Sequence, residues 1–251
     1  MTNSSYLKSG SDKIAYHKTE GKTPGIIFLG GFRSDMTGVK AMALEAFCKE
    51  RSHAFVRFDY EGHGQSSRAF EDCTLGRWRD DALQVLTKLT EGPQILVGSS
   101  MGGWLALLLA IAKPRRVAGI VGIAAAPDFT ETLLWEKLTP KQQKELQTKG
   151  KVMVPSDFGE PYAITRQFIE EAREHLLLHQ EIPVNCPVRL LHGMKDEDVP
   201  WEVSFSINEK LASQDVKTIL VENGDHRLSE PADIEKILRI VGKMLDISGR
   251  G

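Results

Sequence analysis

The chain has 251 residues, of which 41% are hydrophobic and 26% charged, a composition typical of a folded globular protein and far from that of a disordered chain. Its 32 basic and 34 acidic residues give a formal net charge of -2, so its overall charge favours neither nucleic acid nor an anionic membrane as a partner. We therefore expect a single domain over residues 1–251 that acts on a small-molecule or acylated substrate.

The first predicted element is an antiparallel hairpin at one edge of a sheet, formed by Tyr6–Lys8 and Ile14–His17. Six short runs bounded by glycine, proline or charge then predict buried strands, at Gly25–Leu29, His53–Phe58, Gln94–Val97, Val117–Ile123, Val188–Leu191 and Lys217–Val221. Segments with apolar residues at helical spacing alternate with them, at Gly38–Lys49, Thr74–Leu89, Met101–Ala112, Trp201–Leu211 and Ala232–Leu245. Because parallel neighbours need long crossover connections, the alternation predicts an α/β fold with a mainly parallel sheet and helices on both faces.

One region interrupts this alternation. From 127 to 187 there is no convincing core strand, but helical patterns cover Phe129–Leu138, Pro140–Thr148 and Ala163–His179. We interpret the region as a helical cap inserted over the carboxyl edge of the sheet, where loops often carry specificity. A set of ordinary crossover helices is the alternative interpretation.

The strongest motif is VGSSMGGW at residues 97–104, which places Gly98-x-Ser100-x-Gly102 between a predicted buried strand and a predicted apolar helix. A serine on so tight a strand-to-helix turn needs small neighbours, because helix and strand pass too closely for side chains. The helix also directs its amino end at the serine, where backbone N–H groups stabilise negative charge. We therefore predict Ser100 as a nucleophile, whereas Ser99 lies off the centre of the five-residue frame.

A serine hydroxyl is a weak nucleophile unless a base removes its proton. In folds that carry the nucleophile on such a strand-to-helix turn, the chain order is serine, acid, histidine. Among the seven histidines, His226 is the one that follows both the serine and a candidate acid. For the acid we favour Asp196, the first carboxylate after the strand at 188–191, and keep Asp198 as the alternative or as a helix cap. His192 precedes the acid at the strand end, and we expect it to have a structural or solvated role.

The oxyanion formed by such an attack needs two hydrogen-bond donors. We predict the backbone N–H of Met101, directly after the serine, and that of Phe32, which follows two glycines after the first core strand. Arg33 comes next, and its guanidinium is a candidate partner for a substrate carboxylate, with a solvated arginine as the alternative. The run DYEGHGQS at residues 59–66 fails the phosphate-cradling pattern, so we interpret it as a structural turn near the site, with His63 as a candidate contact.

The remaining features argue against cofactors and targeting signals. Cys48, Cys73 and Cys186 are widely spaced and odd in number, which argues against a disulfide framework and a zinc site and fits a reducing compartment. No segment has the roughly 20 apolar residues of a membrane span, and the opening MTNSSYLKSGSDK has neither a signal core nor an arginine-rich transit pattern. We expect no metal or organic cofactor and a cytoplasmic location, with the mitochondrial matrix as the alternative if a presequence has been removed.

Several motifs together resemble the α/β-hydrolase superfamily over nearly the whole chain. They are GGF at 30–32, DYEGHGQS at 59–66, GSSMGGW at 98–104, D-x-x-V-P at 196–200 and the DH pair before the final helix. More narrowly, GSSMGGWL at 98–105 and IPVNCPVRLLHGMKDEDVPW at 182–201 resemble the family of mitochondrial palmitoyl-protein thioesterases of the abhydrolase-domain-ten type and their bacterial relatives.

The resemblance implies the α/β-hydrolase fold and a depalmitoylating thioesterase that also hydrolyses acyl glucuronides, with Ser100, Asp196 and His226 at the positions of that family's triad. It favours Asp196 over Asp198 independently of the position after the strand. We therefore expect a serine hydrolase of esters or thioesters. One alternative is the same fold catalysing carbon–carbon bond hydrolysis or perhydrolysis, and a second is a non-catalytic binding protein on the hydrolase scaffold.

Overall fold

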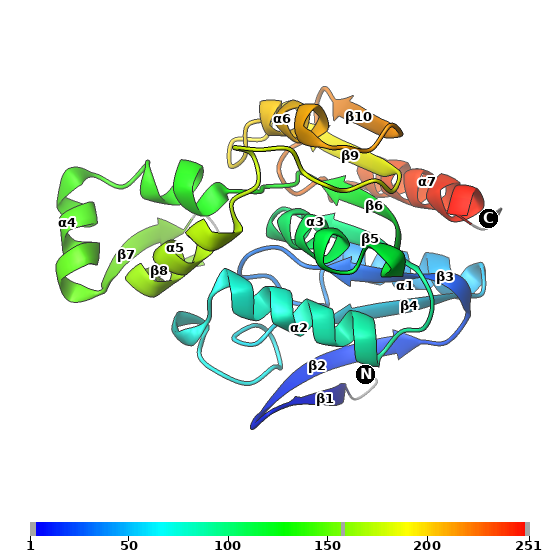
Figure 1. The fold of residues 1–251 in the computed structure, drawn as a ribbon, viewed down its shortest axis with the longest axis horizontal. Coiled ribbons are helices and arrows are strands. Elements are labelled where there is room, and N and C mark those ends of the chain that lie inside the picture. The colour runs from blue at the N-terminus through cyan, green and yellow to red at the C-terminus, as the bar shows by residue number, and fades with distance from the viewer. Residues whose placement is uncertain (1–3, 157–158, 249–251) are drawn as a thin grey trace.

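The computed structural model describes residues 4–156 and 159–248 and has at its centre an eight-stranded, mainly parallel sheet (Figure 1). The strand order is β1-β2-β4-β3-β5-β6-β9-β10. The strands are β1 Ser5–Ser9, β2 Asp12–Thr19, β3 Lys22–Leu29, β4 His53–Phe58, β5 Gln94–Ser99, β6 Val117–Ile123, β9 Val188–Gly193 and β10 Val216–Val221. β1 and β2 form the antiparallel hairpin predicted at the edge, and every pairing from β4 across to β10 is parallel. The predicted α/β architecture is confirmed.

Helices cover both faces of the sheet, as the alternation predicts (Figure 1). They are α1 Val39–Glu50, α2 Leu75–Lys88, α3 Met101–Ala112, α6 Glu202–Lys210 and α7 Pro231–Ser248, with 3₁₀ turns at Phe70–Asp72 and Pro114–Arg116. One buried apolar cluster joins α2 and α3 to the sheet through Trp78 and Trp104, and a second joins α1 and α7 to it through Leu44 and Val241. None of the helices in the described part of the chain is both long enough and apolar enough to cross a membrane.

β5 carries the chain to the middle of the sheet. Every residue of β5 is buried, whereas β1 and β10 at the sheet edges have exposed positions. Leu96 belongs to the cluster under α2 and α3, and its neighbours Ile95 and Val97 belong to the cluster under α1 and α7. Successive side chains of a strand point to opposite faces, so a strand covered on both sides is apolar throughout. β5 therefore ends, directly before Ser100, at the centre of the carboxyl edge.

The region between β6 and β9 contains a β-hairpin in place of part of a predicted helix. Its elements are a π-helix at Thr130–Trp135, α4 Pro140–Lys149, β7 Lys151–Ser156, β8 Gly159–Thr165, α5 Arg166–Ala172 and a 3₁₀ turn at Arg173–His175. β7 and β8 pair with each other in an antiparallel sheet of their own. The helical prediction for 163–179 is therefore wrong at both ends, because its first residues belong to β8 and its helical structure stops at His175.

Local signals explain this hairpin. Gly150 ends α4 in a left-handed conformation, with a φ of 79°, which turns the chain out of the helix. In β7, Val152 and Val154 are buried and the residue between them is exposed, the period-two alternation of a half-buried strand. The Thr165 hydroxyl then accepts from the Phe168 N–H and caps the start of α5. The helix therefore begins only after β8 has ended.

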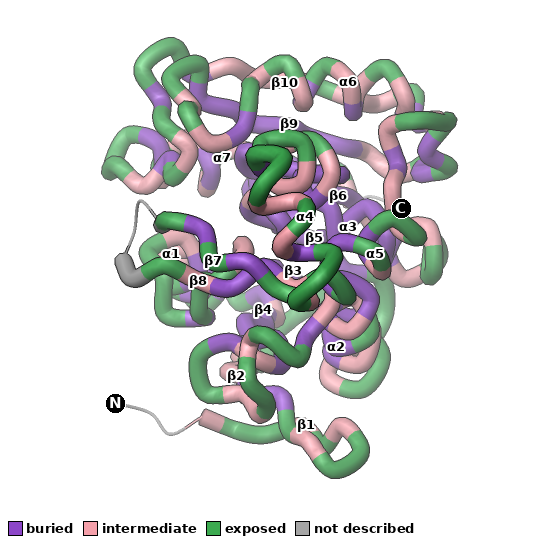
Figure 2. The backbone as a smooth tube through the Cα atoms, turned by 90° about the vertical axis from the view of Figure 1, so that its left-hand side faces the viewer, coloured by how far each residue is buried: buried purple, intermediate pink, exposed green. Residues whose placement is uncertain are grey.

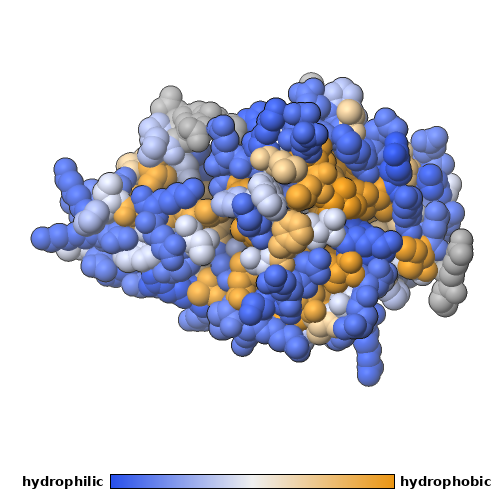
Figure 3. All heavy atoms as spheres, turned by 90° about the horizontal axis from the view of Figure 1, so that it is seen from above, coloured by the Kyte–Doolittle hydropathy of each residue, from blue (hydrophilic) through white to orange (hydrophobic). Residues whose placement is uncertain are grey.

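The described residues of the inserted region, 127–156 and 159–187, lie at the carboxyl edge of the sheet. Figure 1 shows α4, β7, β8 and α5 to the left of the sheet, and Figure 2, viewed from that side, shows them in front of it. The two ends of the region are tied together, because the buried Asp128 carboxylate accepts from the N–H groups of Leu177 and Leu178, both at 2.8 Å. Seen from above, the left end where α4 lies is mainly hydrophilic (Figure 3), which agrees with Leu146 being the buried residue of α4.

Candidate active site

Ser100 lies on the sharp turn between β5 and α3. Its backbone angles, a φ of 54° and a ψ of -118°, fall in a region that residues with side chains rarely adopt, so the turn is strained. The Ser100 N–H donates to the Ile123 carbonyl at 2.9 Å, and the Ser100 carbonyl accepts from the N–H groups of Gly103 and Ala126. The neighbouring strand end and the first turn of α3 therefore hold the serine in this conformation.

The glycines of the motif are needed for space, as the sequence predicts. A Cβ on Gly98 would lie 2.2 Å from the Gly102 carbonyl oxygen, and one on Gly102 would lie 2.0 Å from the Leu29 carbonyl oxygen. Both distances are far inside van der Waals contact. A side chain at either position would therefore push α3 away from the sheet.

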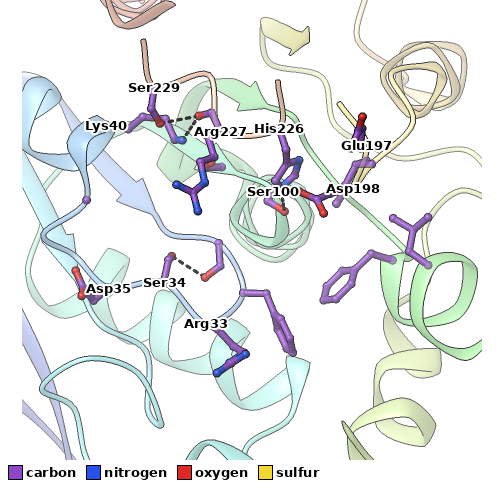
Figure 4. Close-up of a pocket in the computed structure, with 18 of the residues that line it drawn as sticks. Arg33, Ser34, Asp35, Lys40, Ser100, Glu197, Asp198, His226, Arg227 and Ser229 are labelled. Atoms are coloured by element: carbon purple, nitrogen blue, oxygen red, sulfur yellow. Dashed lines mark hydrogen bonds between the residues drawn. The ribbon is translucent and has the colours of Figure 1, made fainter. Parts of the chain in front are cut away.

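Ser100, His226 and Asp196 form a hydrogen-bonded row, and Figure 4 shows the first two side by side. His226 Nε2 lies 3.1 Å from Ser100 Oγ, and His226 Nδ1 lies 2.8 Å from Asp196 Oδ2. His226 comes from the loop between β10 and α7, and Asp196 from the loop after β9. Because a carboxylate only accepts, Nδ1 carries the proton and Nε2 is left to accept from the serine hydroxyl. The arrangement can therefore remove a proton from Ser100.

Asp196, rather than Asp198, is the carboxylate that hydrogen-bonds to His226. Its side chain is completely buried, and Oδ1 accepts from the N–H groups of Asp198 and Val199 at 3.0 and 2.8 Å. Burial raises the pKa of Asp196, but hydrogen bonds from His192, His226 and Val199 outweigh burial and hold the pKa well below its ordinary value. Asp196 is therefore ionised over the whole range in which a histidine acts as a base.

His192 has contacts that its place in the chain order did not reveal. Its ring is completely buried, with Nε2 3.0 Å from Asp196 Oδ2 and 3.1 Å from the Val199 carbonyl, and Nδ1 2.8 Å from Ser204 Oγ. The solvated alternative for this residue is therefore wrong. Its position at the end of a buried strand, four residues before the acid, is the one signal in the sequence that points to the contact.

The loops after β9 and β10 together hold a group of potential metal ligands. Donor atoms of Asp196, Asp198 and His226 lie within 4.8 Å of one another, the one such group of three or more within residues 4–156 and 159–248. Both oxygens of Asp196 already accept two hydrogen bonds each, which leaves little capacity to bind a cation. The hydrogen-bonded row therefore accounts for the closeness of Asp196 and His226.

The loop after β3 passes close to the serine. A Cβ on Gly31 would lie 3.5 Å from Ser100 Cβ, so the backbone of this loop is next to the candidate nucleophile. The Arg33 N–H donates to His63 Nε2 at 3.1 Å, and His63 Nδ1 lies 3.3 Å from the Glu61 carbonyl. His63, which the sequence suggests as a candidate contact, thus accepts a hydrogen bond from the backbone of this loop and is not part of the pocket lining.

Phe32 connects this loop to the inserted region. Its ring centroid lies 5.0 to 5.8 Å from those of Phe70, Trp78, Phe129, Tyr162 and Phe168. The guanidinium of Arg33 lies 4.3 Å from the Tyr162 ring centroid, a cation–π contact with β8. Met101 is the buried first residue of α3. Of the two predicted oxyanion donors, Phe32 is therefore in the loop beside Ser100, and Met101 begins the helix that follows it.

The burial of His63 has a consequence for the pH dependence of stability. Burial lowers the pKa of His63 to about 4 from its ordinary value of 6.5, so the neutral ring accepts from Arg33. Between these values the unfolded chain binds more protons than the folded one. We therefore expect His63 to lower the free energy of unfolding by about 3 kcal/mol as the pH falls from about 7 to about 4.

Urea unfolding at both pH values measures this fall in the free energy of unfolding, and the His63→Gln variant is compared with the wild type. The glutamine Oε1 reaches the position of Nε2 and accepts from the Arg33 N–H, but it does not titrate. The variant should therefore lose less stability than the wild type over this pH range. An identical pH dependence in the two proteins would contradict the prediction.

A pocket of about 700 Å³ opens in front of Ser100, a size typical of small-molecule sites. The inserted region contributes Phe129, Leu133, Leu134, Pro155 and Tyr162 to its apolar lining, and the sheet domain contributes Phe28, Phe32, Val39, Ala41, Ala126 and Val199. Its polar lining includes Arg33, Ser34, Asp35, Lys40, Glu197, Asp198, Arg227 and Ser229, which Figure 4 shows around Ser100 and His226. The pocket therefore offers space for both an apolar chain and a polar group beside the serine.

Comparisons with known proteins identify the family and the fold. A family model described as "Alpha/beta hydrolase family" matches residues 26–237. The Mus musculus protein named "Palmitoyl-protein thioesterase ABHD10, mitochondrial" is 48% identical over 241 residues, which cover 95% of this chain and 81% of that protein.

Two solved structures share the fold over nearly the whole chain. "Alpha/beta hydrolase domain-containing protein 10 from mouse" superposes with a TM-score of 0.91 at 47% identity, covering 98% of this chain and 99% of that one. A putative hydrolase from Agrobacterium vitis S4 superposes with a TM-score of 0.92 at 38% identity, covering 98% of each chain. The fold expected from the sequence motifs is thus confirmed.

Proposed function

The chain belongs to the alpha/beta hydrolase family, and from this premise we propose that it cleaves acyl thioesters and esters through a covalent acyl-enzyme on Ser100. The observation that carries the proposal is the row in which His226 contacts Ser100 at 3.1 Å and Asp196 at 2.8 Å. Such a row supplies the activated nucleophile that acyl transfer requires. The name of the mouse relative, a palmitoyl-protein thioesterase, supports a long-chain acyl thioester as the substrate.

In the first half of the reaction, His226 Nε2 removes the hydroxyl proton of Ser100 as Oγ attacks the carbonyl carbon. The tetrahedral intermediate then collapses, the bond to the thiol or alcohol breaks, and the leaving group takes the proton from His226. Asp196 keeps the imidazole in the productive tautomer and stabilises the imidazolium between the two transfers. The product is an ester of the acyl group with Ser100.

In the second half, a water molecule gives a proton to His226 Nε2 and attacks the acyl carbon. The new tetrahedral intermediate expels Ser100 Oγ, which regains its proton from His226. A carboxylic acid leaves and the starting state is restored. The same base thus serves both halves of the reaction.

We assign stabilisation of the oxyanion to the backbone N–H groups of Met101 and Phe32. Met101 is at the first position of α3, where backbone N–H groups lack partners within the helix and the helix dipole favours negative charge. The assignment of Phe32 is supported by the hydrogen bond from the next N–H, that of Arg33, to His63. This bond and the aromatic neighbours of Phe32 hold the loop in place before substrate arrives.

The apolar lining supports a binding site for the acyl chain beside the inserted region, which we propose acts as a cap on a single catalytic domain. Arg33 lines the same pocket, and we keep it as the proposed contact for a substrate carboxylate, such as that of an acyl glucuronide.

The mouse relative also bears on the cellular location, because it is named as a mitochondrial protein. We therefore propose a mitochondrial location in place of the cytoplasmic one expected from the sequence.

The dependence of activity on acyl-chain length tests the proposed substrate. We expect kcat/KM for acyl thioesters to rise about threefold to fourfold with each added methylene until the apolar lining is filled, because each buried CH₂ contributes about 0.8 kcal/mol. Replacing Leu133 and Leu134 together by alanine should flatten this dependence, since both line the pocket. Initial rates across a series of acyl thioesters measure both effects.

Leu176→Ala is the matched control for this pair of substitutions. Leu176 is a partly buried leucine of the same inserted region, but it is not part of the pocket lining. It should leave the dependence on chain length as in the wild type. If the double variant also kept the wild-type dependence, the acyl chain would not bind against these leucines.

A further inference from the structure

The carboxylate of Asp196 is surrounded by four hydrogen-bond donors, and one of them is a second histidine. Oδ1 accepts from the N–H groups of Asp198 and Val199. Oδ2 accepts from His226 Nδ1 at 2.8 Å and from His192 Nε2 at 3.0 Å. Two imidazoles therefore share the oxygen that orients the proposed base.

The neighbours of His192 determine where its proton lies. Nε2 faces the Asp196 carboxylate and, at 3.1 Å, the Val199 carbonyl. Both groups only accept, so Nε2 carries a proton and donates it toward Asp196. Nδ1 lies 2.8 Å from Ser204 Oγ on α6. His192 and Ser204 are completely buried, so water does not compete for these bonds.

We propose that His192, held by Ser204, is a positioning residue that fixes the carboxylate of Asp196 for catalysis, an inference that rests on the proposed function of the triad. Asp196 belongs to the loop after β9, whereas His192 belongs to β9 itself. The bond between them ties the loop carboxylate to the rigid sheet. Without this donor, Oδ2 accepts from His226 alone while Oδ1 keeps its two backbone donors, so the carboxylate holds the base less firmly in its orientation.

Loss of the hydrogen bond from His192 to Asp196 is expected to change kcat rather than KM. His192 lies behind Asp196 and is not part of the pocket lining, so it does not contact substrate. Misplacing a catalytic group by about 1 Å costs about 100-fold in rate. We therefore expect loss of the donor to lower kcat by about 10- to 100-fold, with KM within about twofold of the wild type.

Two amide variants of the same position provide the test. In His192→Gln the amide nitrogen reaches the place of Nε2 and donates to Asp196, whereas in His192→Asn it reaches only the place of Nδ1, beside Ser204. The asparagine variant should show the loss in kcat, and the glutamine variant should recover to within about threefold of the wild type. The measurements are kcat and KM for acyl-thioester hydrolysis, together with the Tm of each variant.

Ser204→Ala provides a second test that does not alter the histidine. It removes the partner of Nδ1 and should lower kcat by about fivefold, the effect of one ordinary hydrogen bond, again without a change in KM. A wild-type kcat in both His192→Asn and Ser204→Ala would overturn the positioning role. Equal losses of kcat and Tm in the asparagine and glutamine variants would also overturn it, because they would indicate a purely structural residue.

Ser100→Ala separates this inference from the proposed function. If that variant kept full activity, the triad itself would be wrong. If it were inactive while the two His192 variants behaved like the wild type, only the positioning role of His192 would fail.

Discussion

Ser100→Ala is expected to lower kcat for thioester hydrolysis by about a millionfold, to the level left by binding and the oxyanion donors alone. Ser100 Oγ is the atom that His226 Nε2 contacts, and alanine at this position removes the atom that would carry the acyl group. A fluorophosphonate probe, which reacts with activated serines, should label the wild type and leave the variant unlabelled. The variant should still fold, since the turn is held by backbone hydrogen bonds.

Ser99→Ala is the matched control for this experiment. Ser99 is the adjacent serine and lines the same pocket, but it lies off the centre of the motif. We expect its kcat to stay within about threefold of the wild type, as for a substitution that removes no catalytic group. Labelling of Ser100→Ala at the wild-type rate, or loss of labelling in Ser99→Ala alone, would show that Ser100 is not the nucleophile.

Asp196→Asn is expected to lower kcat by about 10⁴-fold with little change in KM. An asparagine amide presents an N–H group toward His226 Nδ1, where the carboxylate accepted a hydrogen bond. The ring then accepts at Nδ1 and carries its proton on Nε2, the wrong tautomer for removing a proton from Ser100. Because the Asp196 side chain is completely buried, water does not restore the original arrangement.

Asp198→Asn distinguishes the two candidate acids. The Asp198 carboxylate lines the pocket, but its link to the row is a backbone N–H that donates to Asp196 Oδ1. This substitution keeps that N–H, so we expect kcat within about tenfold of the wild type. Steady-state kinetics of both variants give the comparison. A larger loss in Asp198→Asn than in Asp196→Asn would reverse the assignment of the acid.

The strands of the sheet were predictable because a strand that is covered on both faces is apolar along its whole length. β4 and β6 begin and end where the apolar runs predict, at His53–Phe58 and Val117–Ile123. The hairpin of β7 and β8 was not predictable in the same way. A strand with one exposed face has few buried positions, here Val152 and Val154 in β7, and the residues at 163–165 suit a helical pattern as well.

The amino-acid sequence alone identifies which serine and which histidine are candidates for catalysis. The glycines around Ser100 indicate that strand and helix pass close to each other there. His226 is the candidate base because it follows both the serine and the acid in the chain. Both signals are readable along the chain, because they depend on local backbone geometry and on order.

Which groups surround these residues becomes clear from the folded chain. His226 lies 30 residues from Asp196 and 126 from Ser100 along the chain, and the three meet because their strands end at one edge of the sheet. The contacts of Asp196 with His192, and of Arg33 with His63, depend on how side chains pack inside the folded loops. A local pattern records which residues are buried, but not which partner each one meets after burial.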